Sequence, residues 1–417
     1  ALKNKKVPTP IALMGKKSFI KNEALGIILV ISPWNYPFFQ AIVPIALALV
    51  CGNAVIYKPS EFTPLKGLVE RLLATVGLPK NWVQIVYGDG LVGEKLIEGK
   101  PSKIFFTGSV ATGKKIMKKA SESLIPVELE LGGKDAMIIF DDVNLDRASS
   151  GALWGGLTAS GQSCTSVERI LVHENIYEDF KELLVKKAKK IRLGAQSDFN
   201  VDIGPMVTAS QVLIVAEHLE DALLKGAKLL TGETWDRKSS LIPPLVLEGV
   251  TPQMKIFSEE TFGPILPLIS FNNEEQAIYL ANLTEFGLTS SVWSKDLVRA
   301  NRVADKLKCG GVSINNVMLT EGNPYLPFGG IKNSGMGRYK GHYGFLSFSN
   351  TKSIIQNADS KMIEAHWFPY SEKKYNLFRK MMVGLFSNGL IPFISFLING
   401  LRLEGYANKK AKSLLKV

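Results

Sequence analysis

Short runs of β-branched and aliphatic residues alternate with longer amphipathic stretches from residue 23 to about residue 140. Five runs have the composition of buried strands, and they cover residues 27–31, 54–57, 83–87, 103–106 and 127–131. Four stretches between them predict helices, which cover residues 38–50, 64–76, 92–98 and 112–123. Continuous apolar strands separated by helices are typical of a parallel sheet covered on both faces. The pattern therefore predicts a doubly wound α/β domain.

A second alternation of the same kind begins at residue 136. It predicts strands at 136–140 and 169–173 and helices at 145–160, 176–191 and 208–225. A stretch rich in proline and glycine at 232–252 is expected to be a loop, and more strands and helices follow to about residue 315. Six glycines within residues 322–341 indicate a structured loop rather than a linker. The chain is therefore expected to contain two α/β domains.

Composition and charge narrow the class of protein. A chain of 417 residues with 46% hydrophobic and 21% charged residues is neither disordered nor fibrous. The formal net charge of +12 first suggests a nucleic-acid partner. However, residues 1–22 carry +6, residues 361–417 carry +7, and the body at 23–360 carries −1. A duplex-binding domain concentrates basic charge on one folded face, so no nucleic-acid partner is expected.

Cysteine spacing bears on the compartment. Cys51, Cys164 and Cys309 lie far apart and form no CxxC pair. This spacing excludes a disulfide framework and a zinc ribbon, so no metal site is expected, and it suits a reducing, cytoplasmic compartment. No apolar stretch of signal-peptide type occurs at the N-terminus. Because the sequence begins at Ala1 rather than at Met, we expect a truncated or processed piece.

The segment Met381–Leu401 has 21 residues without a charge, and Arg379, Lys380 and Arg402 flank it. A helix needs about 20 apolar residues to cross a bilayer core. Asparagine, proline, serine and glycine within the segment disfavour a spanning helix and favour an interfacial or partner-packed one. Three interpretations stay open: peripheral membrane contact, a tail helix buried at an oligomer interface, and a true span.

One glycine-rich motif has the GxGxxG spacing of a dinucleotide fingerprint, Gly88–Gly93, and lies between a predicted strand and helix. Such a fingerprint also needs an acid at the end of the next strand to hold the ribose. That strand ends Phe106-Thr107-Gly108, without an acid. A pyrophosphate site is therefore not expected at this motif.

A second motif, residues 108–115, nearly matches a P-loop. Lys115 replaces the Ser or Thr that holds magnesium, which argues against ATP hydrolysis. Gly108, Ser109 and Gly113 still place small residues at a helix N-terminus, where backbone N–H groups bind phosphate. The motif therefore predicts a phosphate contact without a metal.

Three residues are candidates for covalent chemistry. Cys164 stands in a polar loop that contains Gly161, and a thiolate in a turn with free N–H groups is a strong nucleophile. A lone cysteine is also often structural, and local chemistry leaves both interpretations open. Glu130 ends a strand at the edge where parallel sheets bind ligands, although a solvated strand-end acid is the alternative. Asn35 follows the first strand and can reach the same edge as a hydrogen-bond donor.

Seven motifs in order carry a family resemblance. They are Pro33-Trp34-Asn35-Tyr36-Pro37, Lys58-Pro59-Ser60-Glu61, Phe106-Thr107-Gly108-Ser109, Glu130-Leu131-Gly132-Gly133-Lys134, Gly161-Gln162-Ser163-Cys164, Glu259–Pro264 and Pro327–Gly335. Together they cover roughly residues 7–355 and resemble the NAD(P)-dependent aldehyde dehydrogenase superfamily. The resemblance implies two doubly wound α/β domains, one of them a Rossmann-type cofactor domain, and a small oligomerisation segment.

The resemblance implies catalytic roles for three residues. Cys164 would attack the aldehyde carbonyl to form a thiohemiacetal, and oxidation would leave a thioester. Asn35 and the backbone N–H of Cys164 would form the oxyanion hole. Glu130 would be the general base for the water that releases the carboxylic acid. The presence of both Cys164 and Glu130 favours this reaction over a catalytically silent protein, and Glu130 favours it over acyl transfer to coenzyme A.

For two further residues the resemblance implies binding of the adenine end of the cofactor. Lys58 and Glu61 are similar to the pair that binds the adenine ribose hydroxyls. An acid at this position repels a 2′-phosphate, so NAD is expected, with NADP as the alternative.

The other implied cofactor contacts lie nearer the reacting centre. Trp34 and Ser109 match positions near the pyrophosphate, in keeping with the phosphate contact that the turn at 108–113 predicts. Glu260 matches the contact to the nicotinamide ribose, and Phe262 matches the residue that packs on the nicotinamide side.

The predicted organisation has four parts. They are an NAD-binding domain at 1–132, a catalytic domain at 133–335, a bridging or oligomerisation segment at 336–360, and a basic, apolar tail at 361–417. Members of the family usually carry a longer segment before the Pro-Trp-Asn motif, so the N-terminal part of the first domain is expected to be missing. A homodimer is also expected.

Substrate features point in two directions. Leu326–Gly330 and Asn333–Gly337 are similar to the branch that includes fatty-aldehyde and coniferyl-aldehyde dehydrogenases, and the apolar tail fits that branch. Ser166–Arg169 resembles the branch that acts on smaller aldehydes or semialdehydes. We expect an apolar fatty or isoprenoid aldehyde, with a small aldehyde as the alternative. A basic, apolar tail suits an anionic membrane, so the expected location is the cytoplasm or the membrane surface.

Overall fold

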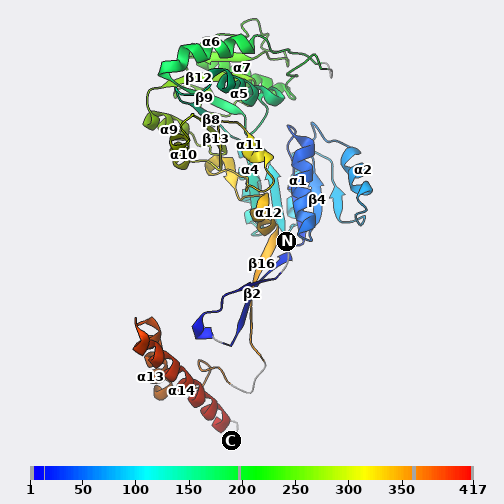
Figure 1. Ribbon diagram of the computed structural model, residues 1–417. Coiled ribbons are helices and arrows are strands. Elements are labelled where there is room, and N and C mark those ends of the chain that lie inside the picture. The colour runs from blue at the N-terminus through cyan, green and yellow to red at the C-terminus, as the bar shows by residue number, and fades with distance from the viewer. Residues whose placement is uncertain (1–3, 14, 196–198, 359–362, 415–417) are drawn as a thin grey trace. The chain divides into compact units, whose positions relative to one another are not determined.

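The computed structural model describes residues 4–13, 15–195, 199–358 and 363–414 (Figure 1). The chain divides into two compact units. The larger consists of Ala1–Asn4 and Lys21–Lys352, and the smaller of Lys5–Ile20 and Ser353–Val417. The larger unit contains two mainly parallel sheets covered by helices, so the predicted α/β fold class is confirmed. The finer division at residues 132, 335 and 360 stays a prediction.

The first sheet has six strands, five of which the apolar runs predicted. In sheet order they are β15 (Gly335–Met336), β7 (Val127–Glu130), β6 (Lys103–Thr107), β3 (Ile27–Ile31), β4 (Ala54–Lys58) and β5 (Val83–Ile85). Neighbours are parallel except β15, which runs antiparallel to β7. The chain moves outward from β3 to β5 and then returns to β6 on the other side of β3. The strand order therefore reverses between β3 and β6, and ligands bind at such a reversal.

Four helices connect these strands, α1 (Pro37–Val50), α2 (Leu68–Thr75), α3 (Gly90–Glu98) and α4 (Val110–Ser121). They agree with the predicted helices, except that α2 begins at Leu68 rather than at residue 64. Gly67 precedes it with φ +82°, a left-handed conformation that glycine adopts without steric cost. The N–H of Gly67 donates to Glu70 Oε2 at 2.8 Å, which fixes the start of the helix.

The second sheet has seven strands, all after residue 134. In sheet order they are β10 (Lys228–Leu229), β11 (Leu245–Glu248), β12 (Ile265–Phe271), β9 (Val167–His173), β8 (Asp135–Ile139), β13 (Thr289–Trp293) and β14 (Gly311–Ile314). Only the short β10 runs antiparallel to its neighbour. The expectation of a loop across 232–252 was wrong in part, because β11 is buried and pairs with β12. Its apolar run of three residues after two prolines is too short to show a strand period.

Helices cover both faces of the second sheet. They are α5 (Leu145–Leu157), α6 (Tyr177–Ala188), α7 (Ala209–Leu224), α8 (Lys255–Ser258), α9 (Glu274–Asn282) and α10 (Leu297–Lys306). Two short helices follow the sheet, α11 (Leu319–Gly322) and α12 (Gly341–Ser347). Buried side chains form one core on each face of the sheet, with Ile138 on one side and Ile139 on the other. This alternation is the period of two that a strand buried on both faces requires.

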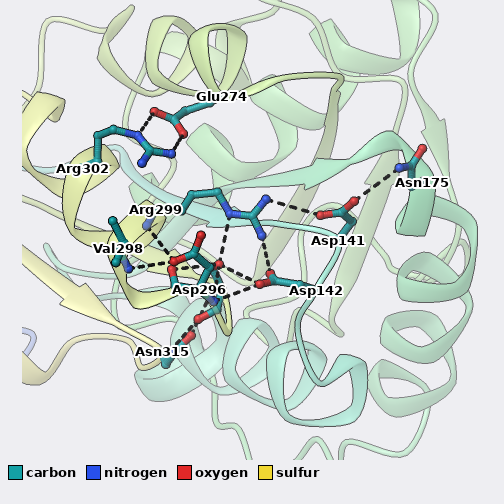
Figure 2. A network of polar contacts seen from close by, with 10 residues as sticks. Asp141, Asp142, Asn175, Glu274, Asp296, Val298, Arg299, Arg302 and Asn315 are labelled. Atoms are coloured by element: carbon teal, nitrogen blue, oxygen red, sulfur yellow. Dashed lines mark hydrogen bonds and ion pairs between the residues drawn. The ribbon is translucent and has the colours of Figure 1, made fainter.

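An ion-pair network ties helices α9 and α10 to the second sheet (Figure 2). The guanidinium of Arg299 lies 2.8 Å from Asp142 and 3.6 Å from Asp141, the acids that follow β8. On the next turn of α10, Arg302 lies 2.6 Å from Glu274 of α9. These carboxylates at the sheet edge thus have cationic partners, which indicates a structural role.

The smaller unit contains the tail. Strand β1 (Lys5–Val7) pairs antiparallel with β2 (Lys17–Ala24), and the sheet order continues to β16 (Ser349–Gln356). Two helices, α13 (Glu372–Phe386) and α14 (Leu390–Leu414), form an antiparallel hairpin, drawn in red in Figure 1. The uncharged segment is therefore divided between two helices. Of the helices that the structure describes, none is long and apolar enough to cross a membrane.

Candidate active site

Cys164 is presented by an unusual turn after α5. The helix ends at Leu157, three residues earlier than predicted, because Thr158 leaves the helical region with ψ 138°. Ala159, Ser160 and Gly161 then all have positive φ values, of 51°, 58° and 74°. Non-glycine residues in this conformation cost about 1–2 kcal/mol each, and such strain is concentrated at functional sites. The turn directs the chain out of α5 toward the first sheet and leaves Cys164 half-buried beside it.

Two glycines between β7 and β8 let three segments meet at the nucleophile. A Cβ atom at Gly133 would lie 2.2 Å from the carbonyl oxygen of Cys164. A Cβ atom at Gly132 would lie 2.2 Å from Glu260 Oε2. The contact at Gly133 is with backbone, so this position requires glycine, whereas a side chain at 132 would displace the carboxylate of Glu260. Since Glu130 ends β7 two residues earlier, the same turn brings Glu130, Cys164 and Glu260 together.

A cavity of about 230 Å³ lies at this meeting point. Its lining contains eight of the eleven residues that the sequence singled out, namely Trp34, Asn35, Gly108, Ser109, Glu130, Cys164, Glu260 and Phe262. Gln211 and Ile214 of α7 also line it and were not predicted. Residues from both sheets thus converge on one space that the nucleophile candidate faces.

A second cavity, of about 610 Å³, lies where the first sheet reverses its strand order. It shares Trp34, Gly108 and Ser109 with the smaller cavity, and its far end is lined by Lys58 and Glu61. Its position beyond the carboxyl ends of β3 and β6 is where α/β sheets of this topology bind nucleotides. The volume is within the range of small-molecule and cofactor sites. Ten of the eleven predicted residues therefore line two cavities with shared walls.

Lys58 and Glu61 form a polar pair at the far end of the larger cavity. Their charged atoms, Lys58 Nζ and Glu61 Oε2, are 3.7 Å apart, and Lys58 Nζ also donates to the carbonyl of Pro59 at 3.0 Å. Burial lowers the pKa of Lys58, while the charge of Glu61 opposes that shift. Glu61 remains half-exposed, so its carboxylate is accessible from the cavity.

The two glycine-rich motifs occupy different places. Ser109 caps α4, because its Oγ accepts from the N–H of Thr112 at 3.3 Å, and Thr112 lines the larger cavity. Gly113 faces away from that lining: a Cβ atom there would lie 2.7 Å from the side chain of Leu131. The missing side chain thus lets α4 pack on β7, and the expected cofactor contact at Gly113 gains no support from its position. Gly90 and Gly93 of the GxGxxG motif also line the cavity, although no pyrophosphate site is expected at this motif.

Asn35 is held in a defined orientation. Its Nδ2 donates to the carbonyl of Gln162 at 3.0 Å, two residues before Cys164. An amide nitrogen has two N–H donors, so one remains to act on a group in the cavity. The hydrogen bond also fixes the nucleophile loop to the segment that follows β3.

The surroundings of Cys164 and Glu130 disfavour the ionised form of both side chains. Burial raises the pKa of the Cys164 thiol well above its usual value, and the charges of Glu321, Glu130 and Glu260 raise it further. Burial also raises the pKa of Glu130, and Glu128 and Glu321 add to that shift. Within the described residues, Glu130 Oε1 is buried without a hydrogen-bond partner. A buried, unpaired carboxyl beside a thiol is typical of a group that exchanges protons with a ligand.

Glu260 and Phe262 are positioned by a buried ion pair that the sequence did not reveal. Glu168 accepts the N–H groups of Thr261 and Phe262, each at 2.8 Å, and lies 2.6 Å from Lys134 Nζ. Glu260 accepts from the N–H of Gly133 at 3.0 Å, and burial raises its pKa to about 8. The ring of Phe262 meets that of Trp34 edge to face, with centroids 5.4 Å apart.

A third cavity, of about 900 Å³, lies beside α1. Its apolar wall comes from α1, with Phe39, Ile42, Val43, Ala46, Leu47 and Val50. Glu321 and Lys340 also line it, and Glu321 Oε2 accepts from Thr165 Oγ1 at 3.4 Å, next to the nucleophile. Lys340 donates to the carbonyl of Glu321 and lies over the ring of Phe328 at 5.1 Å. Sequence reasoning missed both residues, because 156 positions separate Glu321 from Thr165.

Residues 1–354 of the chain match the sequence profile described as the aldehyde dehydrogenase family. The chain belongs to this family. It is 44% identical over 372 residues to a 4,4′-diapolycopene aldehyde oxidase from a Methylomonas species, covering 89% of this chain and 69% of the relative. It is 39% identical over 352 residues to a betaine aldehyde dehydrogenase from Brucella anthropi, covering 82% of this chain and 72% of the relative.

Solved structures of aldehyde dehydrogenases have the same fold. A betaine aldehyde dehydrogenase from Staphylococcus aureus, in complex with NAD⁺, aligns with a TM-score of 0.80 and 35% identity over 88% of this chain and 73% of its own. An NADP-dependent enzyme from Escherichia coli aligns with a TM-score of 0.82 and 34% identity, over 85% and 74%. The predicted superfamily, fold class and enzyme class are confirmed, and the finer branch stays a prediction. This aldehyde dehydrogenase is an oxidoreductase.

Proposed function

We propose that this aldehyde dehydrogenase converts an apolar aldehyde into its carboxylic acid through a thioester on Cys164, with NAD as electron acceptor. The observation that carries the proposal is the 230 Å³ cavity, which places Cys164, Glu130, Asn35 and Glu260 around one space. It shares part of its lining with a nucleotide-sized cavity. A largely apolar cavity is lined by Glu321, which accepts a hydrogen bond from Thr165 next to the nucleophile. A nucleophile, a carboxyl base and an amide donor in such an arrangement suit acyl chemistry.

The larger cavity suits a dinucleotide. Thr107 Oγ1, on a residue that lines it, is buried without a hydrogen-bond partner within the described part of the chain, which leaves a polar atom for a ligand. Lys58 and Glu61 would hold the adenine ribose, Ser109 the pyrophosphate, and Glu260 the nicotinamide ribose. When bound, NAD supplies the hydride acceptor for the oxidation. The carboxylate of Glu61 repels a 2′-phosphate, which supports NAD over NADP.

The chain's own residues account for the acylation half of the reaction. The Sγ of Cys164 bonds to the aldehyde carbon, and the carbonyl oxygen becomes an oxyanion in a thiohemiacetal. Asn35 Nδ2–H and the backbone N–H of Cys164 donate to that oxygen, which lowers the barrier because they are oriented before the charge develops. The thiol proton passes to solvent water as the Sγ–C bond forms, because the raised pKa of Cys164 keeps the thiol neutral before the attack. Oxidation at the former aldehyde carbon leaves the thioester.

Hydrolysis of the thioester is the role proposed for Glu130. Its carboxylate takes a proton from a water as the water oxygen bonds to the thioester carbon. The C–S bond then breaks, the carboxylic acid leaves, and the Cys164 thiol is restored. A base with a raised pKa is suited to this step, because it binds the proton more tightly than an ordinary carboxylate.

An apolar substrate is supported by the wall of the third cavity. Six side chains of α1 form an apolar surface in the cavity that Glu321 also lines, which fits a hydrocarbon chain. The relative from Methylomonas is named for a long polyene aldehyde, whereas other relatives are named for betaine aldehyde and 3-sulfolactaldehyde. Glu321, in the same lining, is the feature that would favour a small polar aldehyde instead.

Two further expectations belong to this proposal. An enzyme that acts on long apolar aldehydes works where such molecules partition, so we place it at the cytoplasmic surface of a membrane. The homodimer expected from the resemblance is proposed on that ground alone.

The test is an aldehyde panel from short to long apolar chains, with NAD in excess and NADH formation as the readout. We expect kcat/KM to rise with chain length until the apolar cavity is filled. Cys164→Ala is expected to lose at least 10³-fold in activity while NAD binding persists. Cys309→Ala, at a thiol that does not line the 230 Å³ cavity, is the matched control. Full turnover by Cys164→Ala would overturn the mechanism, and preference for small polar aldehydes would overturn the substrate class.

A further inference from the structure

Helix α14 has an apolar stripe on its exposed side. Leu390, Ile391, Ile394, Leu397, Ile398 and Leu401 form this outer stripe, and the most exposed of them, Ile391, is 82% exposed. At 100° per residue these six positions fall within an arc of about 120°. A helix packed on a globular protein normally turns polar residues to this side. The outer stripe therefore needs a partner that the smaller unit does not supply.

The outer stripe is separate from the hairpin's own core. Phe396, Leu403 and Ala407 of α14 are buried on the opposite arc of the helix. The two helices cross closely at Gly384, where a Cβ atom would lie 2.7 Å from the backbone nitrogen of Phe396. The hairpin thus has its own packed interface, and the outer stripe is additional to it.

The end of the hairpin continues the apolar surface. Phe386, at the last turn of α13, is 77% exposed and precedes the connection to Leu390. With the outer stripe it forms what we call the apolar tip. Basic side chains border the tip: Arg379 and Lys380 on α13 and Arg402 on α14 are exposed, and no acid occurs between residues 373 and 403.

Aromatic side chains gather farther from the tip. Trp367, Phe368, Tyr370 and Tyr375 are all more than half exposed. They precede α13 or lie in its first turn, at the end of the hairpin opposite Phe386. Rings with a polar atom, such as Trp and Tyr, are enriched where hydrocarbon meets lipid headgroups.

We propose that the apolar tip docks into one leaflet of an anionic lipid bilayer and holds the enzyme at the membrane surface. Three features favour lipid over a second copy of the chain or another protein. Apart from Phe386 the tip is aliphatic, and it lacks the mixture of polar and aromatic anchors that protein interfaces use. Its border carries Arg379, Lys380 and Arg402, with no acid between residues 373 and 403, which complements anionic headgroups. Exposed aromatic residues of the kind enriched at lipid headgroups precede α13 or lie in its first turn.

The dimensions limit the depth of insertion to one leaflet. Leu390–Leu401 extends about 18 Å at 1.5 Å per residue, and Met381–Phe386 only about 9 Å. Half of a bilayer's hydrocarbon core is about 15 Å. Because Arg379 and Lys380 lie so near the tip, the hairpin enters obliquely, with these side chains extended to the headgroups. A tilted hairpin of this kind agrees with the finding that no described helix is suited to crossing a membrane.

This inference rests on the proposed location at a membrane and not on the proposed chemistry, so the two are measured separately. The full chain is sedimented with phosphatidylcholine vesicles and with vesicles that also contain phosphatidylserine. We expect binding to the anionic vesicles, weakened at least tenfold by high salt. The variant Leu390→Asp/Ile391→Asp is expected to bind at least tenfold more weakly than the unchanged chain.

A matched control exists elsewhere in the chain. Leu297 and Val298 are an exposed apolar pair in the first turn of α10, as Leu390 and Ile391 are in α14. Leu297→Asp/Val298→Asp is expected to bind vesicles like the unchanged chain. Acids in the first turn of a helix are favourable, so both variants are expected to fold, with circular dichroism as the check. NADH formation from a short soluble aldehyde is expected to be equal in all of them.

Three results would overturn the proposal. One is binding to neither kind of vesicle, and another is undiminished binding by Leu390→Asp/Ile391→Asp. The third is a stable dimer in light scattering that this variant dissociates, since the tip would then be an interface between copies. If vesicle binding follows the prediction but NADH formation fails, the docking stands and the proposed chemistry fails.

Discussion

A Cβ atom at Gly133 would lie 2.2 Å from the carbonyl oxygen of Cys164, so the backbone after β7 directly supports the nucleophile. Glu260 accepts from the N–H of the same glycine at 3.0 Å. One residue without a side chain thus sets the spacing between the nucleophile loop and the proposed nicotinamide ribose contact. The geometry of the site depends on this close packing as much as on the reactive groups.

Gly133→Ala is expected to displace Cys164, because the methyl group cannot be accommodated against a backbone carbonyl. A shift of about 1 Å at a reacting group costs about 10²-fold in rate, so kcat is expected to fall by that factor. Steady-state NADH formation is the measurement. Gly405→Ala, where the added Cβ has open space, is expected to leave kcat unchanged. Equal rates for the two variants would contradict the packing role.

Glu130→Gln is expected to form the thioester and then stall, because the amide cannot take the proton from water. A single burst of NADH should be followed by turnover reduced at least 10²-fold. Intact-mass spectrometry after mixing with NAD and aldehyde should detect the acyl adduct on Cys164. Normal turnover with no adduct would show that another group is the base.

The pH dependence of turnover follows from the same residue. Burial raises the pKa of Glu130, and the base acts only when ionised, so kcat is expected to fall as pH decreases through that raised pKa. In Glu130→Gln the residual kcat should no longer show this decrease at low pH. A profile with the same decrease in both proteins would assign the titration to another group.

Glu321→Gln is expected to make the Cys164 thiol react at lower pH. Among neighbouring charges, that of Glu321 raises the pKa of this thiol most, so its removal lowers the pKa and increases the thiolate fraction. The rate of iodoacetamide inactivation against pH is the measurement, and its midpoint should move to lower pH. Glu178→Gln, at an exposed acid of α6, is the matched control and should leave the midpoint unchanged.

Lys134→Met is expected to destabilise the fold and weaken NAD binding together. The change leaves the carboxylate of Glu168 buried without its cation, which typically costs about 3–5 kcal/mol in free energy of unfolding. Urea denaturation measures the stability, and calorimetric titration measures the NAD affinity. Arg302→Met, which removes the half-exposed partner of Glu274, should cost less than about 1 kcal/mol and leave NAD binding intact.

The order of residues predicted five of the six strands of the first sheet, but in the second sheet it located only β8 and β9. Runs such as Ile27–Ile31 and Lys103–Thr107 are buried on both faces, so their apolar composition is nearly continuous and easily recognised. It also made Glu130 and Cys164 candidates, because a strand-end acid and a thiol in a polar turn are visible in the order of residues. The seven ordered motifs then indicated the family, which gave both residues an expected role.

Which distant groups surround the nucleophile depends on how the chain folds. Glu321 reaches Thr165 across 156 positions, and Glu168 holds Thr261 and Phe262 across more than 90. Side-chain contacts of this kind depend on how loops pack over a sheet, and the period of hydrophobic residues along the chain does not predict that packing. The same holds for Gly113, whose small size permits the contact with Leu131, and for β11, whose short run becomes a strand only beside β12.

The composition of the tail showed that it is apolar, whereas the fold decided which side chains remain exposed, because α13 buries one arc of α14 and leaves the other uncovered.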